Sequence, residues 1–176
     1  MSTVVLYKSK YGSTKQYAEW IANDTGADIF SMDEFSLEKL AAYDTVIVGG
    51  YLHIGKIVGA EFLTANWPAL QNKKVVMFSV GGSPTDTPDR TRWFENSVPT
   101  NIREHVANFP LRGRAMNLDW KDTLLMAFPR AQLRLKYWRN PTPGNKAAMA
   151  AFKPFDRVRR ESIEPLVNFV RNLKWA

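Results

Sequence analysis

The chain contains no cysteine and only two histidines, His53 and His105. The lack of cysteine excludes disulfide bonds, thiolate catalysis and sulfur-ligated metal sites. The scarcity of histidine weighs against a transition-metal site. Because few side chains suit acid–base or nucleophilic chemistry, we expect a bound cofactor to carry any catalysis. We therefore assign no catalytic residue and no metal site.

The chain also lacks a long hydrophobic run. No apolar segment approaches the roughly 18 residues of a membrane-spanning helix, and the N-terminus leads into an apolar strand pattern instead of a targeting peptide. These features predict a cytoplasmic protein. The 176 residues, 45% of them apolar, predict one domain over 1–176. The net charge of +7 predicts an anionic partner.

Short apolar segments alternate with helical patterns along the chain. The expected strands cover 3–7, 27–31, 44–50, 74–80 and 111–118. The expected helices cover 14–25, 36–43, 58–67 (ending before Pro68), 89–108 (interrupted at Pro99) and 156–173. This alternation predicts an α/β fold with a doubly wound five-stranded parallel sheet in the order 2-1-3-4-5. In that order a ligand binds at the carboxyl ends of the first and third strands.

The first expected strand runs into a loop rich in hydroxyl groups, Ser9-Lys10-Tyr11-Gly12-Ser13-Thr14. The loop matches neither Gly-x-x-x-x-Gly-Lys-Ser/Thr nor Gly-x-Gly-x-x-Gly, so a nucleoside triphosphate or a dinucleotide is not the expected ligand. Its position before a helix predicts a phosphate-binding loop. We expect Ser13 to be the N-cap, with Gln16 completing a capping box. The alternative is an ordinary turn in which Ser13 only caps the helix.

Two more loops, 51–56 and 81–86, follow the third and fourth expected strands. Since the carboxyl ends of parallel strands meet at one edge of a sheet, we expect all three loops to meet there. His105 falls in the broken helical stretch, and we expect it to lie at the surface.

The three loops resemble those of flavodoxins. Residues 9–14 resemble the loop that binds the FMN phosphate, with Tyr11 where the family prefers threonine, and residues 44–55 and 74–82 resemble the two strands and loops that flank the flavin. The resemblance implies that FMN is bound noncovalently, with its phosphate on Ser9, Lys10, Tyr11, Gly12, Ser13 and Thr14. It implies that the isoalloxazine ring lies against Tyr51, Leu52, His53, Ile54, Gly55, Gly81, Gly82 and Ser83. Tyr51 or His53 is expected to pack on the ring; alternatively they are a rim aromatic and a solvated histidine.

Two features depart from the carrier flavodoxins, which are typically acidic. This chain is basic, and it has an insertion at about 119–155 with seven basic residues against two acids, a net charge of +5. By position and composition the insertion resembles that of the menaquinone-dependent protoporphyrinogen oxidase branch of the flavodoxin superfamily. The resemblance implies a role in substrate or membrane-quinone access.

Three interpretations of the insertion stand. It binds an anionic membrane surface, it receives an acidic porphyrin or protein partner, or it is a solvated lid. Pro129 and the mixed periodicity argue against a single amphipathic helix. On the closing helix, we expect Arg157, Arg159, Arg160 and Arg171 to form the solvated face. No nucleic-acid-binding pattern is visible.

Three functional hypotheses follow. The leading one is an FMN-binding electron carrier that serves a redox partner protein. The alternative is an FMN-dependent oxidoreductase of protoporphyrinogen oxidase type with a quinone as acceptor. The third is a non-redox protein that binds another phosphorylated ligand in the first loop.

Overall fold

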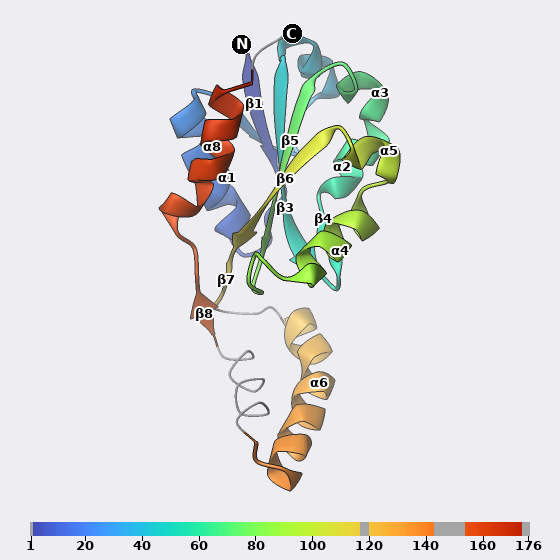
Figure 1. Ribbon diagram of the computed structural model, residues 1–176, viewed down its shortest axis with the longest axis vertical. Coiled ribbons are helices and arrows are strands. Elements are labelled where there is room, and N and C mark those ends of the chain that lie inside the picture. Colours follow the sequence, from blue (N-terminus) through green and yellow to red (C-terminus); the bar gives the residue numbers. More distant parts are fainter. Residues whose placement is uncertain (1, 117–119, 143–153, 174–176) are drawn as a thin grey trace. The chain divides into compact units, whose positions relative to one another are not determined.

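The structure, a computed structural model, describes residues 2–116, 120–142 and 154–173 (Figure 1). The chain divides into two compact units. The first comprises Met1–Gly113 and Arg157–Ala176, and the second comprises Arg114–Asp156. The insertion expected at 119–155 lies within the second unit.

The first unit is built around a parallel sheet in the order β2-β1-β3-β5-β6, with the short β4 paired antiparallel to β3. The strands are β1 (Thr3–Tyr7), β2 (Asp28–Ser31), β3 (Thr45–His53), β4 (Lys56–Val58), β5 (Lys74–Gly81) and β6 (Val106–Arg112). Because β4 only extends β3 into a hairpin, β5 and β6 are the fourth and fifth parallel strands. The predicted order 2-1-3-4-5 is therefore confirmed.

Helices cover both faces of this sheet (Figure 1). They are α1 (Ser13–Thr25), η1 (Leu37–Ala42), α2 (Ala60–Ala65), α3 (Trp67–Leu70), α4 (Pro88–Ser97), α5 (Thr100–Arg103), η2 (Arg160–Ile163) and α8 (Glu164–Arg171). Val4 and Leu6 of β1 join one apolar cluster, and Val5 between them joins the other, together with Ile21 of α1 and Leu166 of α8. The continuous apolar runs of the strands thus reflect burial on both faces.

The fifth strand lies earlier than predicted. Residues 106–108 were expected to end a broken helix, but they begin β6, and the predicted strand at 111–118 overlaps only its last residues. Pro110 stands inside this strand, which is possible because β6 is at the edge of the sheet. Of the predicted strand, residues 117–118 lie outside the described residues.

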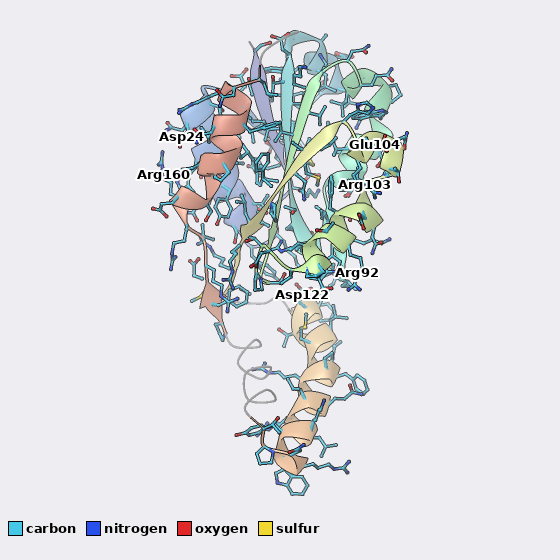
Figure 2. All side chains as sticks on the ribbon, viewed as in Figure 1. Asp24, Arg92, Arg103, Glu104, Asp122 and Arg160 are labelled. Atoms are coloured by element: carbon cyan, nitrogen blue, oxygen red, sulfur yellow. The ribbon has the colours of Figure 1, made fainter. Side chains whose placement is uncertain are left out.

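Two helices also differ from the prediction. The helix expected to stop before Pro68 is two short helices, with Pro68 in the first turn of α3, where its missing N–H is not needed. The closing helix is shorter than 156–173, because Pro165 stands in the first turn of α8. An ion pair from Arg160 to Asp24 (2.6 Å) ties the segment before α8 to α1 (Figure 2). The broken helix predicted over 89–108 is α4 and α5 and ends at Arg103, and the other predicted elements agree to within three residues.

The second unit contains β7 (Arg114–Ala115), paired antiparallel with β8 (Phe155–Asp156), and the long helix α6 (Trp120–Arg139). The helix runs for 20 residues and continues through Pro129. Pro129 therefore does not interrupt the helix, and apolar residues on more than one of its sides agree with the expectation that it is not one clean amphipathic helix.

Gly50 of β3 offers a test of the packing at the hairpin. A Cβ at this position would lie 2.4 Å from the carbonyl oxygen of Val58 in β4. We expect Gly50→Ala to lower the free energy of unfolding by about 1–3 kcal/mol, because the backbone of β4 must shift. Chemical denaturation measures the change, with Thr91→Ala on the exposed side of α4 as the control. A Gly50→Ala protein as stable as the control would contradict this packing.

Candidate functional site

The three predicted loops lie at the carboxyl edge of the parallel sheet, where β1, β3 and β5 end side by side. The N–H of Gly113 donates to the carbonyl oxygen of Gly81 (2.9 Å), and a Cβ built on Gly113 would lie 3.6 Å from Ser13 Oγ. A Cβ built on Gly81 would lie 2.4 Å from Leu52 Cδ1. The first loop thus adjoins the third near Gly113, and the third adjoins the second at Leu52.

Gly12, not Ser13, is the N-cap of α1. Its φ of +79° lies in the left-handed region, and the N–H of Gln16 donates to its carbonyl oxygen (3.0 Å). No side chain caps the helix, so the predicted capping box of Ser13 and Gln16 was wrong. Ser13 and Thr14 instead occupy the first turn and are buried. Gly12 adopts the turn that a β-branched or bulky residue would resist, and as a glycine it contributes no side-chain hydrogen bond to the amino end of α1.

Two serine hydroxyls at this edge are buried without a hydrogen-bond partner, Ser9 Oγ in the first loop and Ser83 Oγ in the third. A buried hydroxyl that makes no hydrogen bond costs roughly 1–3 kcal/mol. Such groups are expected where a bound molecule completes the bonding. Nearby, Lys10 places its ammonium group 5.3 Å from the ring centroid of Tyr11, a cation–π contact.

The second loop is a β-hairpin instead of an open loop. His53 pairs with Lys56, which leaves Ile54 and Gly55 as a two-residue turn. Both have positive φ, +48° and +72°, as in type I′ turns. The left-handed region is unfavourable for a β-branched residue such as isoleucine. The strained Ile54 side chain is 72% exposed at the tip.

Side chains alternate along this hairpin. Tyr51 and His53 lie on the same face of β3, with ring centroids 6.5 Å apart in an edge-on arrangement. Leu52 points to the opposite face, towards Gly81. The predicted pair of rings is therefore presented together, half-buried, at the carboxyl end of β3.

Arg90 organises the third loop and is not among the site residues predicted from the sequence. The side chain is 3% exposed. Its guanidinium group donates to the carbonyl oxygens of Ser79, Gly81, Ser83, Pro84 and Leu111, at 2.9–3.4 Å. A signal was present, because Arg90 lies one turn before the buried Phe94 and so falls on the inner face of α4.

A second arginine holds the same loop. Arg157 donates from Nη1 to the carbonyl oxygen of Gly82 (2.8 Å). It precedes η2 and lies outside the closing helix, so its assignment to a solvated helix face was wrong. Arg90 and Arg157 together fix the carbonyl groups of Gly81, Gly82 and Ser83.

These arginines make the edge electropositive. Burial, and to a lesser extent the nearby Arg112 guanidinium, lower the pKa of Arg90 to about 10. Arg90 therefore remains charged at neutral pH. Combined with the amino end of α1, this charge favours an anionic ligand.

His105 is exposed, as expected, and stacks on Trp67 with ring centroids 6.0 Å apart. It lines a cavity of about 320 Å³ with Lys74 and Val75, at the start of β5. That is the opposite edge of the sheet. The lining of this cavity includes no residue of the three loops.

Arg90 can be tested directly. We expect Arg90→Met to lower the free energy of unfolding by at least about 2 kcal/mol, because several carbonyl oxygens lose their donor. The control is Arg92→Met on the same helix, whose side chain is exposed and pairs with Asp89. Chemical denaturation of both variants gives the comparison. Equal losses of stability would contradict the role assigned to Arg90.

Comparison with known proteins agrees with this architecture. A family model described as a flavodoxin domain matches residues 4–134. Uncharacterized protein MJ0298 of Methanocaldococcus jannaschii is 32% identical over 85 residues, which span 48% of this chain and 57% of that protein. The match therefore covers less than two thirds of that relative.

Solved structures include similar chains. Oxidised flavodoxin 2 of Bacillus cereus is 21% identical, with a TM-score of 0.47 over 64% of this chain and 84% of that chain. A flavoprotein of Lactobacillus acidophilus in complex with FMN is 14% identical, with a TM-score of 0.43 over 63% of this chain and 91% of that chain.

The family model covers most of the chain, from β1 into α6. The sheet order β2-β1-β3-β5-β6 is the flavodoxin-like order. The chain therefore belongs to the flavodoxin domain family.

Proposed function

We propose that the chain binds FMN noncovalently at the carboxyl edge of its sheet and transfers electrons through it. The observation that carries this proposal is the first loop. The N-cap of α1 is a glycine, Gly12, which supplies no side-chain hydrogen bond, and the buried Ser9 hydroxyl makes no hydrogen bond. Amide and hydroxyl donors at a positive helix end suit the phosphate of FMN.

The other two loops fit the flavin ring. Tyr51 and His53 present two rings on one face of the hairpin, and the Ser83 hydroxyl is a buried group in need of a partner. Arg90 and Arg157 hold the carbonyl groups of the third loop, so its backbone is preorganised before a ligand arrives. Bound FMN would supply the electron transfer, while the chain supplies binding, orientation and charge.

The charge of the molecule bears on its electron partners. The second unit, Arg114–Asp156, has a net charge of +5, which leaves +2 for the first unit. The first unit therefore has a small net charge, and most of the chain's excess positive charge lies in the second unit. The exposed Ile54 at the tip of the hairpin suits an apolar contact with a redox partner protein or a quinone.

The absorption spectrum of the purified protein tests the binding of FMN. We expect a stoichiometric flavin spectrum, directly or after FMN is added and the excess removed. Ser9→Ala should weaken FMN binding about ten- to hundredfold, since a hydrogen bond to a charged group contributes about 1.5–3 kcal/mol. Ser36→Ala, at an exposed position before η1, is the matched control.

A protein that takes up no flavin would contradict the proposal. If it gained thermal stability from other phosphorylated compounds, the non-redox hypothesis would replace it. Unchanged FMN affinity in Ser9→Ala would remove Ser9 from the site.

A second candidate function is an FMN-dependent oxidoreductase of protoporphyrinogen oxidase type with a quinone acceptor. The observation that favours it is the second unit, which adds an exposed, basic and apolar helix to the flavodoxin-like unit. A simple carrier has no need of such an addition. A porphyrin with carboxylate groups would suit its positive charge.

Removing the second unit separates the two candidates. The N–H of Arg157 donates to the carbonyl oxygen of Gly113 (3.2 Å), so a short turn can join these residues in place of 114–156. We expect this variant to bind FMN within about threefold of the full chain. If the chain is an oxidoreductase, porphyrinogen oxidation with a quinone should be lost in the variant. Turnover that survives the deletion would contradict a catalytic role for the second unit, and a full chain without turnover would favour the carrier.

A further inference from the structure

Helix α6 presents an exposed apolar stripe along its whole length. The stripe consists of Trp120, Leu124, Phe128, Ala131, Leu135 and Trp138. Their spacing of three and four residues places them within an arc of about 80° on the helix. The five large side chains are 48–78% exposed, with the two tryptophans at the ends most exposed of all.

Basic residues flank this stripe. By helical spacing, Arg130 and Arg134 fall along one side, and Lys121 and Arg139 fall along the other. All four are exposed, as is Lys136. The one acidic residue of the helix, Asp122, is buried and lies away from the stripe. The exposed charged residues of α6 are therefore all basic.

The opposite side of the helix has a different character. Leu133 and Tyr137 fall there and are half-buried. Apolar residues thus occur on more than one side of α6. The sequence therefore shows a mixed periodicity, from which the stripe could not be recognised. Two further apolar side chains, Leu125 and Met126, lie outside the stripe and are less exposed than the large side chains within it, at 45% and 41%.

Several partners can be compared with this surface. In the described part of the chain, no helix is both long and apolar enough to cross a membrane. A second copy of the chain would bring two sets of exposed basic residues together, which disfavours pairing through the stripe. A purely acidic surface would match the charge but would leave the apolar side chains in water. An anionic lipid surface matches both, because it offers negative headgroups above an apolar layer.

We propose that α6 lies in the headgroup region of an anionic membrane, with the stripe facing the acyl chains. The arginines and lysines along its sides extend to the lipid phosphates. Trp120 and Trp138, apolar with a polar N–H, suit the interface at both ends. This inference concerns the second unit alone and stands whether or not the first unit binds FMN.

Vesicle binding by the full chain is the test. We expect the protein to sediment with vesicles of equal parts phosphatidylglycerol and phosphatidylcholine, and to bind pure phosphatidylcholine at least roughly tenfold more weakly. Hydrogen exchange on the same samples should show new protection in residues 120–139 when the anionic vesicles are present.

Paired variants assign the binding to α6. Leu124→Gln with Phe128→Gln removes the centre of the stripe, and Arg130→Gln with Arg134→Gln removes charge beside it. Each pair should weaken binding roughly tenfold or more. The control pair, Lys39→Gln with Arg92→Gln, removes the same charge from the exposed surface of the first unit and should bind like the unmodified chain.

Each other outcome would overturn the proposal. A chain that stays in solution with anionic vesicles, or binds without protection of 120–139, does not use α6 on membranes. Binding lost in the arginine variant but kept in the apolar variant would assign the helix to an acidic partner. A dimer in sedimentation analysis that the apolar variant abolishes, without vesicle binding, would assign the stripe to a second copy.

Discussion

Burial of the parallel sheet on both faces determines where the polar groups of the first unit can lie. Val4, Val5 and Leu6 of β1 are fully buried, and β3 and β5 are buried over most of their lengths. Because helices cover both faces of the sheet, polar ligand-binding groups lie at the ends of its strands. The crossover from β1 also delivers the amino end of α1 to the carboxyl edge, where the loops after β3 and β5 arrive as well. The position of the site follows from the core.

A buried cation stabilises that edge. Removing Arg90 from water is costly, and its position is sustained because five carbonyl oxygens accept its hydrogen bonds. The same bonds fix the third loop, which contains three of the proposed ligand-binding residues. The charge of Arg90 and the positive end of α1 both lie at the carboxyl edge of the sheet, and together they favour binding of an anion there. The carbonyl groups that accept these bonds are turned away from solvent, so the loop is ordered before it binds a ligand.

The sequence predicted the fold better than it predicted the details of the site. The continuous apolar runs of β1, β3 and β5 and the alternation with helices were enough for the strand order. The predicted bounds of two elements were wrong. Pro110 lies inside the edge strand β6, although a proline is unexpected within most strands, and Pro68 was expected to end a helix but lies in the first turn of α3. At the site, the glycine that caps α1 could not be told from the serine beside it, since the backbone angle of Gly12 decides the matter. Arg157 donates to a carbonyl oxygen 75 residues earlier in the chain, which no local pattern indicates. Arg90 is indicated only by its position one turn before Phe94 on the inner face of α4.

Calorimetric titration of the flavin-free protein with FMN and with riboflavin measures whether the first loop binds the phosphate group. The two ligands share the ring and differ at the phosphate. Charge-assisted hydrogen bonds from Ser9 and the first amides of α1 should make FMN bind roughly a hundredfold more tightly than riboflavin. Equal affinities would contradict the account, because they would mean that the first loop does not hold the phosphate.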